Sequence, residues 1–533
     1  MVHTPSSPPS PPANEAALHD RLRANPADIE ALQLLGKLYL RSSRHEEAEQ
    51  QLSKALALAP ELAEARWLLV GTHVYRGNWR RALDALERLL ESDPHKPDYL
   101  DVKAFALLHL GEAEAAIASY ELLLEGSPTA QHWKSYGHAL KAAGRTGEAI
   151  AAYRKSLALR PAYGMAWWSL AELKSVPFKP SDADLMRAAL AEPDVAPRDQ
   201  AQIHFALGRT YEDAKQYEAS FEHYRQANAV MRSVVKHDAD RRSRFVQRNK
   251  TVFTPDFFRA RGDWGCRQSG PIFIVGLPRS GSTLIEQILA SHSQVEPTSE
   301  LQALENIIRD ISRDEQRKAL QYPELMQNLS SSEVREAGEK YLARVADYRK
   351  LKRPFFIDKM PNNFSYLGTI LTALPNAKVI DARRHPLGCG FAIFSHYFAD
   401  AYSFAFDLAD IGRYYRDYVE LMAHFDAVQA GRVHRVFYEN MVADPEQEIR
   451  KLLTYCGLEF EEQCLRFHEN RRAVLTPSSE QVRRPIFTNA TGLWRHYERW
   501  LGPLKSALGD VLGRYPDVPE FPQSVPLMRW RIS

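Results

Sequence analysis

Residues 15–235 carry a repeating pattern of apolar and polar positions that is typical of paired amphipathic helices. Four apolar helical segments each end at a proline, and these prolines are Pro60, Pro94, Pro128 and Pro161. The spacings between them are 34, 34 and 33 residues. Units of this length bury their apolar faces only by stacking on their neighbours. The pattern therefore predicts an N-terminal, all-α solenoid.

Small and large residues recur in register with these prolines. The first unit contains Leu35, Gly36, Tyr39, Ala48 and Ala55, and the fourth contains Trp133, Tyr136, Gly137, Ala149 and Tyr153. Small residues let two helices approach closely and large ones fill the gap beside them, so we interpret these positions as core and not as a cofactor site. The register resembles that of tetratricopeptide repeats. The resemblance implies a groove that binds a peptide or protein partner.

From about residue 236 the pattern changes to short apolar runs that alternate with helical stretches. The runs with the length and composition of strands are residues 271–276, 355–358, 377–384 and 432–439. Strands that alternate with helices predict an α/β domain with a parallel central sheet. We therefore expect a linker at 236–267, an α/β domain at 268–515 and a C-terminal tail at 516–533.

Charge and cysteine content exclude several classes of protein. Lys and Arg number 69 against 67 Asp and Glu, so the net charge of +2 provides no bulk field that attracts nucleic acid or an anionic membrane. The four cysteines include no C-x-x-C pair, which favours a reducing compartment. No apolar run approaches the roughly 18 residues that span a bilayer. We expect a cytoplasmic protein with a short disordered Ser/Pro leader at 1–14.

The junction between the first predicted strand and the next helix reads GLPRSGST, residues 276–283. Gly276 and Gly281 allow backbone N–H groups to converge at a helix N-terminus, which favours a bound phosphate. Charge and further donors come from Arg279, Ser280, Ser282 and Thr283. Nucleoside triphosphatases carry a lysine where Ser282 stands, so this loop suits a mononucleotide-type phosphate better than a triphosphate.

The segments PRSGST and LIEQILASHSQVEP resemble the 5′-phosphosulfate loop and the following helix of sulfotransferases that use 3′-phosphoadenosine 5′-phosphosulfate (PAPS). The resemblance extends over about residues 270–505 in five short motifs. It is greatest to the protein-tyrosine sulfotransferase branch and to bacterial proteins that fuse tetratricopeptide repeats to such a domain. It implies a P-loop-type fold, PAPS as co-substrate, 3′-phosphoadenosine 5′-phosphate (PAP) as product, and no metal. The histidines show no metal-ligand spacing either.

The resemblance also implies roles for individual residues. Contacts to the 5′-phosphosulfate end would come from Arg279, Ser280, Gly281, Ser282 and Thr283. Glu300 corresponds to the catalytic base, Lys359 to the lysine that neutralises the departing bridging oxygen, and Arg279 is catalytic with them. A carboxylate near the loop suits proton abstraction from an acceptor hydroxyl. Contacts to the rest of the cofactor would come from Arg384, at the 3′-phosphate, and from Tyr438 and Ser478.

The chain departs from the family pattern at three places. Ala392 stands where a serine contact to the 3′-phosphate is expected, and Ser395 and His396 follow it. Leu493 replaces a basic residue, and the arginines around this gap are Arg483, Arg484 and Arg495. The paired arginines that hold acidic peptides are absent after Glu300. The acceptor hydroxyl could therefore belong to a protein tyrosine, a carbohydrate, a lipid or a small molecule.

Two other classes of function stay open. A P-loop nucleotide kinase would share the strand, loop and helix, but Ser282 in place of the loop lysine argues against it. A non-catalytic repeat scaffold with a degenerate nucleotide site is favoured by Ala392 and Leu493. The sequence favours the first reading, a sulfotransferase with Glu300 as general base and a repeat domain for partner or substrate binding.

Overall fold

The computed structural model describes residues 15–173, 178–298, 300–312, 320–470, 472, 481–486 and 491–521. The expected leader, residues 1–14, and residues 522–533 of the expected tail lie outside these ranges. The chain divides into two compact units, Met1–Ser156 and Leu157–Ser533. This boundary falls within the repeat region, and the domain limits expected from the sequence stay predictions.

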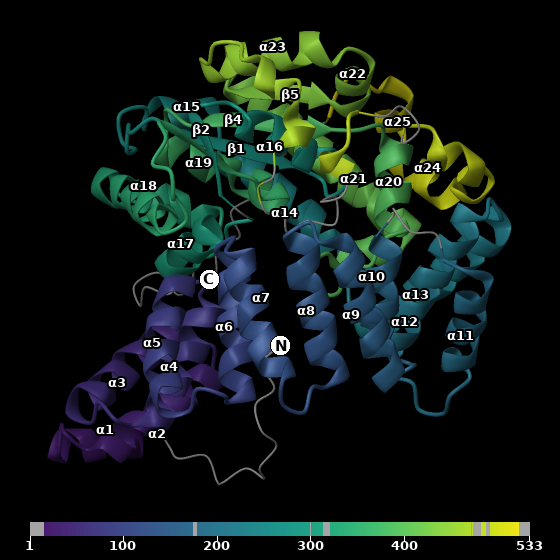
Figure 1. Ribbon diagram of the computed structural model, residues 1–533. Helices are drawn as coiled ribbons and strands as arrows, with labels where there is room; N and C mark the ends of the chain where they lie inside the picture. The colour runs from purple at the N-terminus through teal and green to yellow at the C-terminus, as the bar shows by residue number, and fades with distance from the viewer. Residues whose placement is uncertain are drawn as a thin grey trace, which may run out of the picture. The chain divides into compact units, whose positions relative to one another are not determined.

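The first unit is helical, and consecutive helices pack in pairs (Figure 1). Its helices are α1 (Glu15–Ala24), α2 (Ile29–Arg41), α3 (His45–Leu58), α4 (Ala63–Tyr75), α5 (Trp79–Ser92), α6 (Pro97–His109), α7 (Ala113–Leu124), α8 (Ala130–Ala142) and α9 (Thr146–Leu159), which crosses the unit boundary. A Cβ atom added at Gly36 would lie 2.6 Å from Leu52 Cδ2, and one at Gly137 would lie 2.4 Å from Tyr153 Cε1. The small residues therefore set the close approach of paired helices, as the repeat pattern predicts.

The prediction that the recurring residues form the core is confirmed for most of them but not for all. Leu35, Ala48 and Tyr153 have no exposed surface. Trp133 and Tyr136, by contrast, are only half-buried. The Lys155 ammonium lies 4.2 Å from the centre of the Trp133 ring, and the Tyr136 hydroxyl donates to Glu121 at 3.0 Å. A single sequence does not separate such partly exposed aromatic residues from the core positions beside them.

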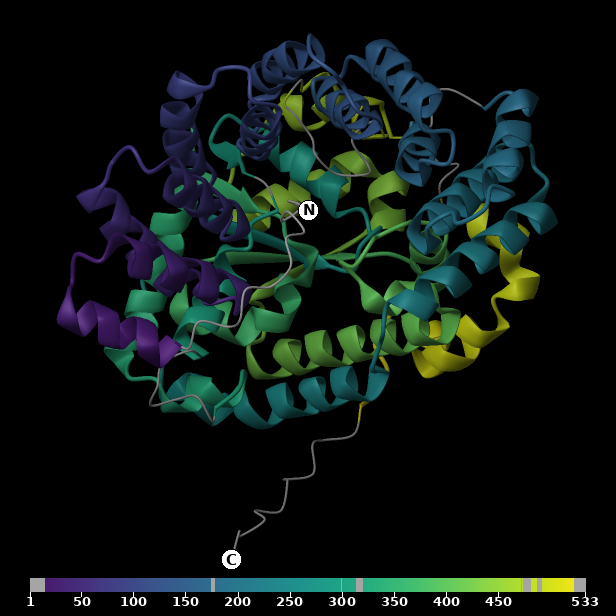
Figure 2. The same cartoon turned by 90° about the horizontal axis from the view of Figure 1, so that it is seen from below.

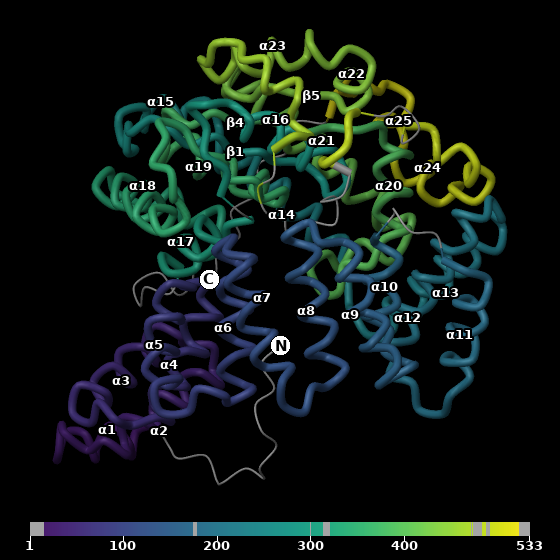
Figure 3. Tube along the Cα trace, viewed as in Figure 1, coloured from purple at the N-terminus to yellow at the C-terminus, as the bar shows by residue number. Residues whose placement is uncertain are grey.

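The second unit begins with four further helices of the repeat region, α10 (Gly164–Glu172), α11 (Pro180–Leu190), α12 (Pro197–Asp213) and α13 (Tyr217–Val234). Two helices, α14 (Ala239–Val252) and α15 (Pro255–Arg259), lie in the expected linker. Helices α12 and α13 pack against each other (Figure 3), and a Cβ atom at Gly208 would lie 2.5 Å from Tyr224 Cε1. Helix α14 lies along α21 (Leu408–Val428), where Lys250 pairs with Glu420 at 2.6 Å (Figure 2).

In the described ranges of the second unit, five strands form one parallel sheet in the order β2-β3-β1-β4-β5. The strands are β1 (Pro271–Gly276), β2 (Val295–Pro297), β3 (Phe355–Asp358), β4 (Lys378–Arg383) and β5 (Val433–Phe437). The predicted parallel sheet is thus confirmed. After β1 the chain continues to one side of that strand through β2 and β3, and then to the other side through β4. Open sheets of this kind bind ligands at the carboxyl ends of strands beside such a reversal.

Helices and short 3-10 segments surround the sheet. The remaining helices are α16 (Ser282–Ala290), α17 (Ala303–Ser312), α18 (Ser331–Ala346), α19 (Leu367–Ala373), α20 (Pro386–Phe394), α22 (Tyr438–Ala443), α23 (Pro445–Cys456), α24 (Gly502–Leu508) and α25 (Asp510–Arg514). The core between sheet and helices includes Ile274 and Ile380 from strands and Ile285 and Ile288 from α16. This packing fixes the start of α16 against β1. Among the described helices, none is both long and apolar enough to cross a membrane.

Candidate active site

The loop between β1 and α16 has a backbone that only certain residues adopt. Gly276, Arg279 and Gly281 have φ angles of 141°, 67° and 99°, all in the left-handed half of the map. A Cβ atom at Gly276 would lie 2.4 Å from the Ala382 carbonyl oxygen. One at Gly281 would lie 2.7 Å from Tyr438 Cδ2. The two glycines therefore let the loop pass directly beside the ends of β4 and β5.

The loop places several hydrogen-bonding groups at the start of α16. Gly281 is the residue that precedes the helix, and it provides no side-chain cap for the first turn. A helix end of this kind is favourable for an anion. Ser280, Ser282 and Thr283 are 2%, 6% and 7% exposed, and the Ser280 Oγ has no hydrogen-bond partner among the described residues. A buried hydroxyl that lacks a partner fits a site built for a polar ligand.

Two arginines meet at this loop. Arg384 directly follows β4, and its Nη1 donates to the Arg279 carbonyl oxygen at 3.2 Å. Its guanidinium also lies 4.9 Å from the centre of the Tyr438 ring. Burial, and then the charge of Arg384, lower the pKa of Arg279 to about 10. A bound anion would offset both effects, so the pair fits a phosphate or sulfate group.

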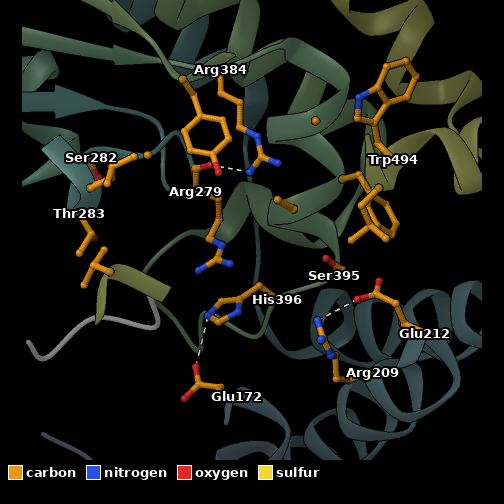
Figure 4. Close-up of a pocket in the computed structure, with 18 of the residues that line it drawn as sticks. Glu172, Arg209, Glu212, Arg279, Ser282, Thr283, Arg384, Ser395, His396 and Trp494 are labelled. Atoms are coloured by element: carbon orange, nitrogen blue, oxygen red, sulfur yellow. Dashed lines mark hydrogen bonds and ion pairs between the residues drawn. The ribbon is translucent and has the colours of Figure 1, made fainter. Parts of the chain in front are cut away.

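These loop residues line one cavity with residues from distant parts of the second unit. Its lining includes Arg279, Gly281, Ser282, Thr283, Arg384, Ala392, Ser395, His396, Tyr438, Arg484, Leu493 and Trp494. Figure 4 shows Arg279 and Arg384 directed into the same space, with Ser395 and His396 across from them. Polar side chains therefore line the same cavity as Ala392, which has no hydroxyl to offer a ligand. Ser478 lies outside the described residues.

Helices α10 and α12 of the repeat region form another wall of this cavity. They contribute Trp168, Glu172, Arg209 and Glu212. Glu172 lies 3.6 Å from His396 Nε2, and Arg209 Nη1 donates to Glu212 at 2.9 Å (Figure 4). The end of the repeat array is thus part of the cavity wall.

The predicted base and the predicted lysine form an ion pair. Lys359 directly follows β3, Glu300 follows β2, and the Lys359 Nζ donates to Glu300 Oε1. The Lys359 side chain is 2% exposed and that of Glu300 is 45% exposed. The carboxylate is therefore open to solvent while the ammonium is held inside. Neither residue lines the cavity that contains the two arginines.

Comparison with known proteins assigns the two parts of the chain. Residues 271–462 match the model of the family described as "Sulfotransferase family". Two models described as "Tetratricopeptide repeat" match residues 39–104 and residues 135–163 and 201–229. The chain carries a sulfotransferase-family domain. In the sequence this domain follows the tetratricopeptide repeats. The last repeat match, residues 201–229, lies in the same compact unit as the domain.

Individual proteins are similar to parts of the chain. An uncharacterized protein of Aquifex aeolicus (strain VF5) is 30% identical over 450 residues, which cover 82% of this chain and 58% of the relative. The chain thus spans less than two thirds of that relative's length. The sulfotransferase domain from the Synechococcus PCC 7002 olefin synthase is 21% identical, with a TM-score of 0.33, over 44% of this chain and 90% of that one. A crystal structure of MamA is 27% identical, with a TM-score of 0.26, over 27% of this chain and 84% of that one.

Two groups of residues around the sulfotransferase-domain site are missed by the sequence analysis. Glu286, on α16, is buried 3.9 Å from Lys359. The sequence could have pointed to Glu286, because a charged residue in the mostly apolar helix LIEQILA requires a charged or polar partner. Arg209 and Glu212 occupy positions that vary between repeat units, so the repeat pattern contains no signal for them. Their position in the cavity wall depends on how α12 packs.

Proposed function

We propose that the chain is a sulfotransferase that moves a sulfuryl group from PAPS to an acceptor hydroxyl. The proposal depends above all on one observation, the meeting of Arg279 and Arg384 in a cavity that begins at the phosphate loop. Two adjacent, half-buried arginines favour an anion in the space that they line. The family match of residues 271–462 supports a sulfonated nucleotide as that anion.

The loop and the adjoining strand ends would hold the donor. Arg279, Ser280 and the first turn of α16 would contact the 5′-phosphosulfate, with Ser282 and Thr283 as further donors. Arg384 would hold the 3′-phosphate, because its planar guanidinium can donate two parallel hydrogen bonds to one phosphate. Ser395 and His396 line the same cavity and would supply the hydrogen bond that Ala392 cannot make. Tyr438, beside Gly281, would hold the nucleotide close to the loop.

Bound PAPS supplies an activated sulfuryl group, whose S–O bond to the 5′-phosphate breaks as a new S–O bond to the acceptor oxygen forms. Glu300 would take the proton of the acceptor hydroxyl, a role that its exposed carboxylate permits. Lys359 would stabilise negative charge on the oxygen that leaves with the phosphate, assisted by the loop N–H groups. Its burial keeps competing water away from the ammonium. In this scheme Arg279 neutralises charge at the sulfuryl end, and none of the described residues is assigned to a metal.

The acceptor would be a hydroxyl on a protein, a glycan or a small molecule, and protein tyrosine is the acceptor of the family branch that the chain resembles. The repeat helices would bind that substrate or another protein partner. A reducing compartment such as the cytoplasm is supported by the four cysteines, which form no disulfide.

Calorimetry with PAP tests the donor site, and labelled PAPS tests the reaction. We expect PAP to bind with one site per chain, and ATP with magnesium to bind far more weakly. Incubation of the protein with isotopically labelled PAPS and a cell extract, followed by mass spectrometry, should identify sulfonated acceptors. The absence of PAP binding would favour a non-catalytic scaffold instead, and magnesium-dependent ATP hydrolysis would favour a kinase.

A further inference from the structure

Helix α16 carries a buried carboxylate just after the phosphate loop. Glu286 lies four residues after Ser282, where the helix begins, and its side chain is 4% exposed. Its neighbours Ile285 and Ile288 pack into the core of the sheet. A carboxylate in such a place costs several kcal/mol unless it is paired with a cation. Glu286 must therefore interact with charged groups inside the protein.

Two cations lie beside this carboxylate. Arg472 Nη2 lies 3.0 Å from Oε1, and Lys359 Nζ lies 3.9 Å from Oε2. Oε2 has no hydrogen-bond partner among the described residues. The Lys359 ammonium thus lies between two carboxylates of different character. Glu286 is enclosed and fixed to a rigid helix, whereas Glu300 is half-exposed.

The difference between the two carboxylates matters if Glu300 is the base. When Glu300 takes a proton from the acceptor, it loses its negative charge and with it most of its hold on Lys359. An ammonium has three N–H donors, so Lys359 can contact Glu300, Glu286 and a departing oxygen at the same time. Glu286 takes no part in this proton transfer, and Arg472 and Lys359 both lie against it.

We propose that Glu286 is a positioning residue that holds the Lys359 ammonium in place while Glu300 changes its protonation state. The inference rests on the proposed function. Helix α16 then has two tasks, because its first turn binds the donor anion and its second turn fixes the lysine that acts on the same anion. A fixed spacing between these groups is what transfer between oriented reactants requires.

Glu286→Gln tests this inference, because it keeps the shape of the side chain and removes its charge. We expect kcat to fall about 10–100-fold, the cost of a catalytic group displaced by about 1 Å. The KM for PAPS and the Kd for PAP should change less than about threefold, because the loop itself is untouched. Glu286→Asp keeps the charge and should restore part of kcat. Glu448→Gln is the matched control, since Glu448 is a buried glutamate paired with a lysine on α23, and it should leave kcat unchanged.

A double-mutant cycle with Lys359→Met distinguishes positioning from a merely structural role. If Glu286 acts through Lys359, then Glu286→Gln should have little further effect on the kcat of Lys359→Met. Equal losses in both backgrounds would overturn the proposal, and so would a Kd for PAP that rises as much as kcat falls. If Glu286→Gln does not fold, Glu286→Asp takes its place in the cycle.

The same pair of substitutions can also be compared by their effects on the urea unfolding midpoint, a measurement that does not depend on activity. Glu286→Gln should shift the unfolding midpoint less in the Lys359→Met background than in the wild type, because Lys359→Met has already removed the ammonium that Glu286 faces. Failure of the wild type to transfer sulfuryl groups from PAPS would refute the proposed function and leave this measurement valid. Additive midpoint shifts would refute the contact between Glu286 and Lys359 itself.

Discussion

Arg384 donates from Nη1 to the carbonyl oxygen of Arg279 at 3.2 Å, so the residue that follows β4 also holds the loop that follows β1. The guanidinium has further N–H groups for a ligand. One residue therefore both shapes the loop and faces the cavity. Because of this dual position, we expect Arg384 to contribute more to the binding of a 3′-phosphate than to the binding of the rest of the nucleotide.

Arg384→Met should weaken PAP binding at least about 30-fold, which corresponds to about 2 kcal/mol for the loss of a charged protein group that contacts the ligand. Binding of AMP, which lacks the 3′-phosphate, should fall much less, because only the hydrogen bond to the Arg279 carbonyl is removed. Calorimetry with the two nucleotides gives the ratio. Arg450→Met removes an arginine on α23 that pairs with Glu446 and should change neither affinity. Equal losses for PAP and AMP would refute a 3′-phosphate role.

Gly281→Ala should damage the loop in two ways. The φ angle of 99° strains any residue with a Cβ atom, and that atom would lie 2.7 Å from the Tyr438 ring. We expect a loss of about 1–3 kcal/mol in unfolding free energy and a marked loss of PAP affinity. Denaturant unfolding and calorimetry measure the two effects. Gly502→Ala is the control, since nothing lies within 4 Å of its added Cβ atom. A Gly281→Ala protein with wild-type affinity would contradict the role of the loop.

Glu300→Gln and Lys359→Met should each lower kcat by roughly 10²–10³-fold, since in the proposed mechanism each removes a charged group that acts in the transition state. PAP binding should remain measurable in both, because neither residue lines the cavity of the two arginines. The double variant should be less impaired than the product of the two losses, because the residues act as a pair. Glu305→Gln, on the exposed side of α17, serves as the control. Unchanged turnover in either single variant would remove that residue from the mechanism.

Burial raises the pKa of Asp358, which precedes Lys359, to about 7, although Tyr341 donates to it at 2.8 Å. In the unfolded chain the pKa returns to about 3.8. Between these two values the folded protein keeps a proton that the unfolded chain has released. Stability from this group is therefore complete below about pH 4 and decreases as the pH rises towards 7, by up to about 1.4 kcal/mol per pH unit.

Asp358→Asn should remove this dependence, because the amide can accept the same hydrogen bond and does not titrate. We expect the variant to gain stability relative to the wild type between pH 5 and pH 8. Urea unfolding at several pH values measures the difference. Parallel stability curves for the two proteins would mean that Asp358 does not hold a proton in the folded state.

Local patterns predict those parts of the fold that depend on neighbouring residues. The repeat period predicts the helix pairs, and the four runs predict β1, β3, β4 and β5. Strand β1 is buried along its whole length and is continuously apolar before Gly276, as buried parallel strands usually are, whereas β5 is mostly half-buried and contains His434 and Arg435. Strand β2 is missed, since its three residues, Val295–Pro297, make no recognisable run. Helix α14 lies in the polar segment 236–267. The ion pair that helps to hold it, Lys250 to Glu420, joins residues 170 positions apart.

The candidate site shows the same division. The loop at 276–283 can be proposed as a phosphate site from the sequence because all its groups lie within eight residues. The resemblance, not the spacing of residues, points to Glu300, Lys359 and Arg384. The ion pair of Glu300 with Lys359 and the repeat-helix wall of the cavity arise from packing between distant segments. Contacts between such distant segments cannot be predicted from local patterns in a single sequence.

The last repeat helices are expected to be an integral part of the sulfotransferase-domain unit. Tyr497 is fully buried, and its hydroxyl lies 2.9 Å from Ser220 Oγ and donates to Glu212 at 3.0 Å. Both partners belong to the helix pair α12 and α13, and Glu212 also lines the cavity. Tyr497→Phe would leave the buried Glu212 carboxylate with one donor fewer. We expect a loss of about 1–3 kcal/mol, the usual cost of such a group.

Tyr217→Phe is the matched control for this prediction. Tyr217 lies on the same face of contact, where its ring stacks on His496 at 4.4 Å, but its hydroxyl has no hydrogen bond to any described residue. Removal of that hydroxyl should leave the unfolding free energy unchanged. If both variants unfold at the same urea concentration as the wild type, the repeat helices are attached by apolar packing alone. If only Tyr497→Phe is destabilised, the buried hydrogen bonds of Tyr497 help to join the repeats to the α/β domain. A domain boundary near residue 236 would then separate the partners of these hydrogen bonds.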